Sequence, residues 1–313
     1  MDQQRLRIGT RGSALALWQA NWVKSQLEET HPNLTVELII IKTRGDKILD
    51  VPLAKVGGKG LFVKELEEAI LDGRADLAVH SMKDVPAEFP PGLGLGPVLE
   101  REDPRDVLLS INYRNLADLP QGAKVGSSSL RRQSQLLAMR SDLNIIPLRG
   151  NVNTRIEKLV NGAFDAIVLA AAGVKRLQMM THVVEFLDPD QVIPANGQGA
   201  VGIEWRLNDR QTADLLQGLN HEETQVCVAA ERAFLATLEG GCQVPIAGFA
   251  KQEGETLTLK GRVASLDGTR CITESQTGPV SDPVSLGKEL AERLLAQGAK
   301  EILSELNEAA SYS

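Results

Sequence analysis

The stretch KVGSSSLRRQSQLLAMRSDLNIIPLRGNVNTRIEKLVNGAFDAIVLA, residues 124–170, decides the fold class of this chain. Three short apolar runs in it predict strands, and the two amphipathic runs between them predict helices. The strands are Lys124–Gly126, Ile145–Leu148 and Ala166–Ala170, and the helices are Leu130–Arg140 and Val152–Val160. Apolar strands that alternate with helices are typical of parallel sheets covered on both faces. We therefore predict an α/β protein with doubly wound sheets.

The same alternation precedes this stretch. It predicts strands at Leu6–Thr10, Val36–Lys42 and Ala75–His80, with helices at Ala14–Glu29 and Leu61–Leu71. Segments that contain proline and glycine, near residues 97–104 and 194–199, are suited to crossings between two lobes. We expect residues 1–99 with 200–218 to form the first lobe and residues 105–194 the second.

The pattern changes after residue 222. A long helix, a run of strands with the turn Asp267-Gly268, and a closing helix predict a small C-terminal α+β domain over residues 222–313, with a three-stranded antiparallel sheet. The helices are expected at Glu222–Leu238 and Val284–Leu306, and the strands at Ile246–Lys251, Thr256–Ala264 and Arg270–Ser275.

Composition excludes several classes of protein. With 34 Lys+Arg against 41 Asp+Glu among 313 residues, the net charge is −7, and aromatics are only 4%. An acidic chain with few rings is a poor candidate for binding nucleic acid by stacking. The start lacks the apolar run of a secretory signal, and the longest small-apolar run, Ala166–Val174, is too short to cross a bilayer. We expect a cytoplasmic protein without nucleic-acid or membrane partners.

Arginine recurs where a predicted strand gives way to a predicted helix. The segments are Thr10–Ser13, Gly126–Arg132 and Arg149–Arg155. A cation at a helix N-terminus costs roughly 0.3–1 kcal/mol unless an anion compensates it. Two accounts remain open: the side chains reach surface carboxylates, or they bind a ligand with several anionic groups at the strand ends. The recurrence favours the ligand.

Two further segments carry charge. Lys55 and Lys59 lie in a glycine-rich stretch that lacks the Walker spacing, so either a lid that contacts anions or an ordinary solvent loop fits it. Asp84 follows Lys83 directly after a predicted strand. A carboxylate among cations stays ionised and can move a proton or stabilise a developing cation, although the spacing alone slightly favours a structural Lys–Asp pair at a turn.

The cysteines differ in their surroundings. Cys242 follows two glycines and precedes Pro245, which predicts an accessible thiol that could act as a nucleophile or attachment point. Cys227 and Cys271 lie in helix and strand patterns, where we expect buried, inert thiols. The spacing fits no metal motif, so no metal is expected.

Six segments together resemble the porphobilinogen deaminase family. They are residues 10–17, 57–66, 80–86, 128–132, 148–155 and 239–245, and they occur in the family's order over nearly the whole chain. The resemblance implies a monomeric three-domain enzyme whose first two lobes are similar to type II periplasmic-binding proteins.

It also implies a transferase reaction. The thiol of Cys242 would carry a dipyrromethane cofactor, onto which four porphobilinogen molecules condense head to tail with loss of ammonia, before water releases hydroxymethylbilane. Asp84 would be catalytic and would contact the cofactor. The cofactor would be held by Lys83, Ser129, Arg131 and Arg132, and the incoming ring by Arg11, Ser13, Arg149, Arg155 and Arg176. The alternative is a non-catalytic two-lobed protein that binds carboxylates, which would leave Cys242 unexplained.

Overall fold

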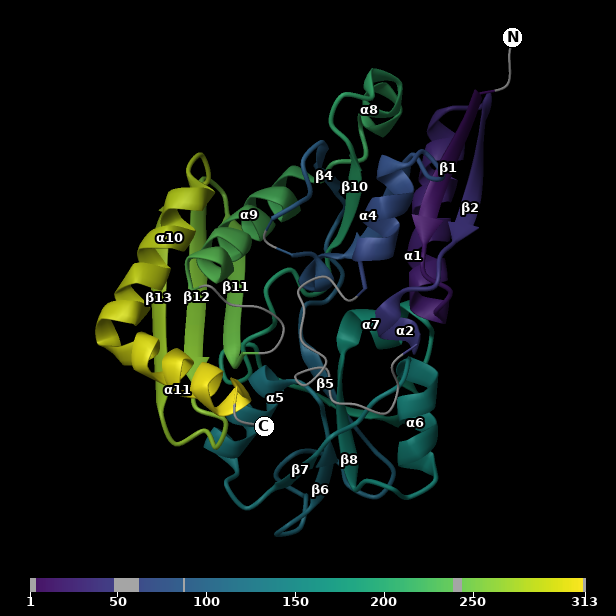
Figure 1. Cartoon of the computed structure of the whole chain (residues 1–313). Helices are drawn as coiled ribbons and strands as arrows, with labels where there is room; N and C mark the ends of the chain where they lie inside the picture. The colour runs from purple at the N-terminus through teal and green to yellow at the C-terminus, as the bar shows by residue number, and fades with distance from the viewer. Residues whose placement is uncertain (1–3, 48–61, 87, 239–243, 312–313) are drawn as a thin grey trace. The chain divides into compact units, whose positions relative to one another are not determined.

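The structure is a computed structural model that describes residues 4–47, 62–86, 88–238 and 244–311 (Figure 1). The chain divides into two compact units. Of the described residues, unit 1 comprises 4–47, 62–86, 88–102 and 200–225, and unit 2 comprises 103–199, 226–238 and 244–311.

Unit 1 contains a five-stranded sheet of order β2-β1-β3-β10-β4. β1 pairs in parallel with β2 and β3, whereas β10 runs antiparallel to both β3 and β4. The strands are β1 (Gln4–Thr10), β2 (Leu34–Ile40), β3 (Leu77–Ser81), β4 (Leu93–Val98) and β10 (Val201–Arg206). The helical segments are α1 (Ala14–Thr30), α2 (Arg44–Lys47), α4 (Lys64–Leu71), η1 (Met82–Asp84) and α8 (Arg210–Leu216).

Helices cover both faces of this sheet. Leu77 and Val79 of β3 pack in the same apolar cluster as α1, whereas Ala78 packs in the cluster that contains α4. Because successive side chains of a strand point to opposite faces, α1 and α4 lie on opposite sides. The doubly wound arrangement predicted from the sequence is therefore confirmed.

Unit 2 contains a second five-stranded sheet, of order β7-β6-β8-β5-β9. Its strands are β5 (Asp106–Ser110), β6 (Lys124–Gly126), β7 (Asn144–Ile146), β8 (Ala166–Ala170) and β9 (Val183–Phe186). Its helical segments are α5 (Leu130–Met139), α6 (Val152–Val160), α7 (Ala171–Arg176) and η2 (Met180–His182). β6 pairs in parallel with β7 and β8, and β5 runs antiparallel to β8 and β9. The two sheets thus have the same topology: three parallel strands are followed by one strand that runs antiparallel to both of its neighbours.

The antiparallel strands correct the expectation of purely parallel sheets. β5 begins just after the chain leaves unit 1 near Glu102, and β10 begins just after it returns near Ala200. Each of these strands is therefore the first element after the chain has passed from one unit to the other. It can run antiparallel to its neighbours because no crossover helix within the same unit precedes it. Neither strand was predicted from the sequence, and nor were β4 and β9.

The C-terminal elements form a three-stranded antiparallel sheet, β11-β12-β13, as expected. The strands are β11 (Ile246–Glu253), β12 (Thr256–Ala264) and β13 (Cys271–Pro279), and α9 (Glu222–Thr237) supplies the fully buried Phe234 to their core. The single closing helix was predicted wrongly. It divides into α10 (Pro283–Leu294), the π-helical segment η3 (Leu295–Ala299) and α11 (Lys300–Ser311), because Gly298 has a φ of 106°. The three-domain boundaries themselves stay a prediction.

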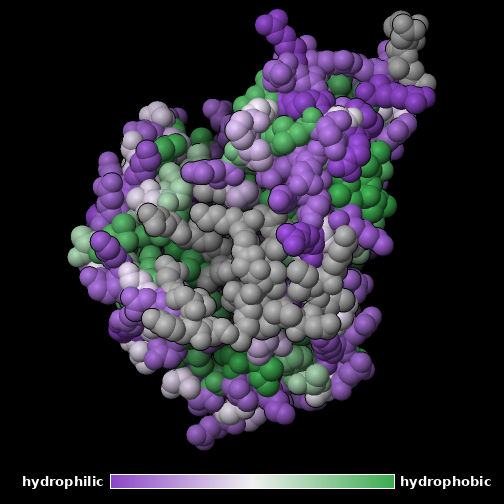
Figure 2. Space-filling model, viewed as in Figure 1, coloured by the Kyte–Doolittle hydropathy of each residue, from purple (hydrophilic) through white to green (hydrophobic). Residues whose placement is uncertain are grey.

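Among the residues coloured by hydropathy in Figure 2, hydrophilic ones predominate and hydrophobic ones form separate groups. Among the helices that the structure describes, none combines the length and the apolar composition that a membrane span requires. The same residues contain no group of three His, Cys, Asp or Glu side chains placed to hold a metal ion.

Candidate functional site

A pocket in unit 1 brings together three residues singled out from the sequence: Arg11, Ser13 and Asp84. β1 ends at Thr10 and α1 begins at Ala14, so the first two lie in the turn between them. Ser13 is the N-cap of α1, and its Oγ accepts a hydrogen bond from the N–H of Ala16 at 3.3 Å. Asp84 ends the short helix η1, which follows β3, and its side chain is half-buried. Neighbouring strands therefore deliver a cation, a hydroxyl and a carboxylate to one pocket.

Arg11 is held on two sides. Its Nε lies 3.1 Å from Oδ1 of Asp46, and its guanidinium carbon lies 4.2 Å from the centre of the Phe62 ring. Burial acts to raise the pKa of Asp46, but the hydrogen bonds and charge of Arg11, with help from Thr43, outweigh it and hold that pKa below its usual value. Arg11 thus already has a partly exposed carboxylate partner within unit 1. This agrees with the first of the two accounts left open by the sequence, in which the arginines pair with carboxylates of the protein.

Buried polar side chains lie beside the same pocket. Gln19 Nε2 donates to Ser81 Oγ at 2.8 Å, and a His80 ring nitrogen lies 2.9 Å from Oε2 of Glu204. His80 and Glu204 are 4% and 1% exposed. Burial, and then the charge of Glu204, raise the pKa of the nearby Glu67. The sequence analysis did not single out Glu67 or Glu204, because a lone glutamate in an apolar pattern gives no signal of a distant partner.

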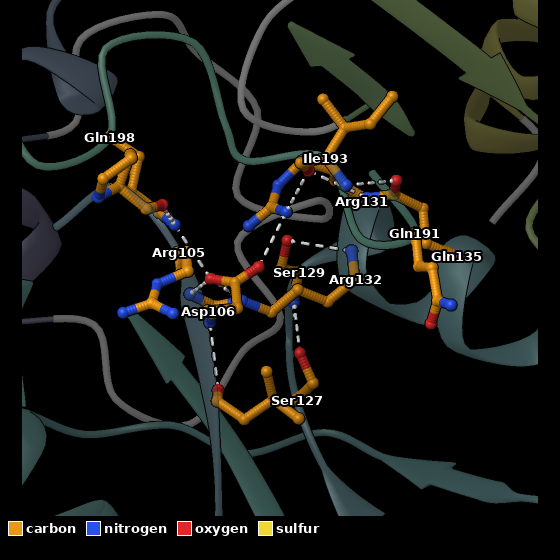
Figure 3. A network of polar contacts seen from close by, with 12 residues as sticks. Arg105, Asp106, Ser127, Ser129, Arg131, Arg132, Gln135, Gln191, Ile193 and Gln198 are labelled. Carbon is orange, nitrogen blue, oxygen red and sulfur yellow. Dashed lines mark hydrogen bonds and ion pairs between the residues drawn. The ribbon is translucent and has the colours of Figure 1, made fainter. Parts of the chain in front are cut away.

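Unit 2 holds a buried arginine pair at the start of α5 (Figure 3). Arg131 and Arg132 are 5% and 6% exposed, and both donate to Asp106, which is fully buried at the first position of β5. Arg131 Nη1 lies 2.8 Å from Oδ2, and Arg132 Nη2 lies 2.8 Å from Oδ1. Ser129 is the N-cap of α5, with its Oγ 3.4 Å from the N–H of Arg132. Three of the predicted cofactor residues therefore lie in one turn.

Burial and charge act against each other in this cluster. Burial acts to raise the pKa of Asp106, but the charges and hydrogen bonds of Arg131 and Arg132 outweigh it and hold that pKa well below its usual value. Burial is also the largest influence on Arg131, whose pKa it lowers. Two guanidinium groups face one carboxylate, so these three groups together carry one net positive charge.

The other predicted arginines of unit 2 lie beyond β7 and β8: Arg149 precedes α6, Arg155 lies within α6, and Arg176 is the last residue of α7. Arg155 Nε donates to the carbonyl of Gly150 at 2.8 Å, and Arg176 Nη2 donates to the carbonyl of Gly199 at 2.8 Å. Arg149 differs: its Nη1 is buried but has no hydrogen-bond partner in the described part of the chain. Such a buried donor marks a place where a ligand could supply the missing acceptor.

Three predicted residues, Lys55, Lys59 and Cys242, lie outside the residues that the structure describes. Lys83 lies in η1 beside Asp84 and is half-buried. Cys227 is buried as expected, but the prediction for Cys271 is wrong, because it is exposed. It is the first residue of β13, whose side chains alternate between exposed and half-buried positions rather than entering the core.

The fold is that of an α/β protein in which cations, capping hydroxyls and carboxylates follow the strands of each mixed sheet, where open α/β sheets commonly bind ligands. Comparison with known proteins gives the family. Residues 6–214 match the family model described as "Porphobilinogen deaminase, dipyromethane cofactor binding domain", and residues 225–296 match that family's C-terminal domain. The chain belongs to the porphobilinogen deaminase family.

Two relatives support this membership over almost the whole chain. The porphobilinogen deaminase of Geobacter sulfurreducens is 59% identical, and that of Geobacter metallireducens is 58% identical, each over 98% of this chain and 96% of the relative. Among solved structures, the periplasmic aliphatic sulphonate binding protein SsuA from Escherichia coli has a TM-score of 0.42 at 17% identity, covering 75% of this chain and 71% of that one. That likeness is too weak to indicate a ligand.

Proposed function

We propose that this chain catalyses the head-to-tail condensation of four porphobilinogen molecules, with loss of ammonia and hydrolytic release of hydroxymethylbilane. The observation that carries this proposal is the match to porphobilinogen deaminases at 58–59% identity over 98% of the chain. The unit 1 pocket agrees with it, because Arg11, Ser13 and Asp84 lie together there.

The residues of unit 2 fit a dipyrromethane cofactor chemically. Each pyrrole of this group carries two carboxylates, and the cluster of Arg131, Arg132 and Asp106 has one positive charge more than negative. We assign Lys83, Ser129, Arg131 and Arg132 to holding the cofactor, and the thiol of Cys242 to its covalent attachment through a thioether. When bound, the cofactor supplies the nucleophilic pyrrole carbon from which the product grows.

The incoming porphobilinogen also carries two carboxylates. We assign their binding to Arg11, Ser13, Arg149, Arg155 and Arg176. Guanidinium groups suit this task because their forked donors match a carboxylate in both charge and geometry. Nη1 of Arg149, which has no hydrogen-bond partner among the described residues, is a donor suited to such an acceptor.

Asp84 performs the proton chemistry in this proposal. Its carboxylate is half-buried in the pocket that also holds Arg11. A carboxylate there accepts a hydrogen bond from the pyrrole N–H of the substrate and stabilises the positive charge that develops as ammonia leaves. It then takes up the proton that the pyrrole carbon loses once the new carbon–carbon bond has formed. Arg11 and Ser13 orient the ring; Asp84 acts on the reacting atoms.

Intact-protein mass spectrometry tests the proposal. The purified wild-type chain should exceed its sequence mass by a dipyrromethane, and Cys242→Ser should remove that excess. Cys271→Ser is the matched control, because Cys271 is an exposed thiol elsewhere in the chain. A wild-type mass equal to the sequence mass, with no ammonia released from porphobilinogen, would instead favour the non-catalytic carboxylate-binding protein. A cytoplasmic location and a monomeric state stay predictions.

A further inference from the structure

Asp106 is the centre of the polar network drawn in Figure 3. Its carboxylate accepts hydrogen bonds from three side chains on other segments: Arg131, Arg132 and Gln198. Oδ2 lies 2.8 Å from Arg131 Nη1, and Oδ1 lies 2.8 Å from Arg132 Nη2, 3.1 Å from Arg132 Nε and 2.9 Å from Gln198 Nε2. The residue is 0% exposed. Its two oxygens therefore fix groups that the chain supplies 25 or more residues later.

Backbone carbonyls complete the hold on each guanidinium. Arg131 Nη1 also donates to the carbonyl of Ile193 at 2.7 Å, and Arg132 Nη1 donates to the carbonyl of Val168 at 3.0 Å. Each arginine is thus fastened to the carboxylate and to one further segment. A guanidinium restrained in this way keeps its remaining N–H groups aimed in fixed directions, which reduces the entropy lost when an anion binds.

The charges within the cluster are unequal. Two buried guanidinium groups share one carboxylate, and an uncompensated buried charge is costly unless an anion approaches it. A second cluster nearby offers a comparison. Asp103, whose side chain is 8% exposed, also pairs with two cations, Arg105 at 2.7 Å and Lys175 at 3.0 Å, but these are more exposed, at 41% and 34%. Water can screen the charges of Arg105 and Lys175, whereas Arg131 and Arg132 are almost completely shielded from water.

We propose that Asp106 is a positioning residue, which aligns Arg131 and Arg132 so that the pair receives carboxylates of the dipyrromethane. This inference rests on the proposed function. Asp106 acts through the two arginines and does not itself touch the cofactor. Its charge holds the arginines together while leaving one positive charge for the ligand.

The test compares Asp106→Asn with Asp103→Asn. Asparagine keeps the size of the side chain but removes its charge and turns an amide donor toward a guanidinium, so one arginine should leave its place. The fraction of purified protein that carries the dipyrromethane, measured by intact mass, should fall at least tenfold in Asp106→Asn. Asp103→Asn should load as the wild type does, even if its thermal midpoint falls.

Each outcome decides a separate point. Normal loading of folded Asp106→Asn overturns this inference and leaves Asp106 a purely structural residue. If Asp106→Asn does not fold, Asp106→Glu replaces it: that variant keeps the charge and displaces it by one methylene, and loading equal to wild type would overturn the inference. Absence of the dipyrromethane from the wild type would instead refute the proposed function.

Discussion

Arg149→Met should leave the protein as stable as before, or more stable, while lowering its activity. Nη1 of Arg149 is buried without a hydrogen-bond partner among the described residues. A buried donor in this state costs about 1–3 kcal/mol, and more when the group is charged. Methionine keeps an unbranched apolar side chain of similar length and removes the unsatisfied donor. We therefore expect the free energy of unfolding to stay unchanged or rise by about 1–2 kcal/mol.

The loss of activity follows from the proposed role. If Arg149 binds a carboxylate of porphobilinogen, its replacement removes charge-assisted hydrogen bonds worth about 1.5–3 kcal/mol. At about 1.4 kcal/mol for each factor of ten, kcat/KM should fall about 10- to 100-fold. Opposite signs for stability and activity are the signature of a residue retained for its ligand rather than for its fold.

Differential scanning calorimetry and steady-state kinetics measure the two effects, and Arg140→Met is the control. The Arg140 guanidinium is fully engaged, donating to Asp142 and to the carbonyls of Leu116, Ala117 and Leu119. Its loss should lower the melting temperature by several degrees, without a comparable effect on kcat/KM. The reasoning is refuted if Arg149→Met melts as early as Arg140→Met and keeps a kcat/KM within twofold of wild type.

Two further predictions concern the unit 1 pocket and the buried carboxylate beside it. Asp84→Asn should reduce kcat by about 10²–10⁴ without changing the melting temperature, and near-normal turnover would exclude Asp84 from the chemistry. Burial and Glu204 raise the pKa of Glu67 above its usual 4.5, so the ionised carboxylate destabilises the fold at neutral pH. This penalty disappears once the pH falls below the pKa that the Glu67 carboxyl has in the unfolded chain. Glu67→Gln should therefore stabilise the protein at pH 7 but not at pH 4. Urea unfolding that shows no gain in the free energy of unfolding at pH 7 would contradict this.

Strong local patterns predicted most of the helices and strands. The expected bounds of Lys124–Gly126, Val152–Val160, Ala166–Ala170 and Thr256–Ala264 match the structure residue for residue. Two of the missed strands, β4 and β9, lack such patterns. β4 reads LGLGPV, whose two glycines and one proline indicate a loop, and β9 has only four residues, all half-buried. Their place in the sheets depends on neighbours distant in the sequence.

The sequence predicted several charged residues of the candidate site but not the carboxylates that pair with them. Arg11, Ser13 and Asp84 were recognised from short motifs, and the structure places them in one pocket. The carboxylates that hold the arginines were missed, since Asp46 lies 35 residues from Arg11 and Asp106 lies 26 from Arg132. Local spacing contains no information about contacts at such separations.

These partners change what arginines at helix starts imply. A cation near a helix N-terminus needs an anion to offset the positive end of the helix dipole. Near the start of α1 and in the first turn of α5, Asp46 and Asp106 already supply that anion, so the arginines there do not by themselves require a ligand. A polyanionic ligand is instead indicated by the charges and donors that these carboxylates leave unbalanced. Among the described residues, Arg131, Arg132 and Asp106 together keep one positive charge, and Nη1 of Arg149 is buried without an acceptor. A ligand rich in carboxylates would satisfy both. Variants that remove the excess positive charge or the buried donor should therefore weaken ligand binding more than they lower the stability of the fold.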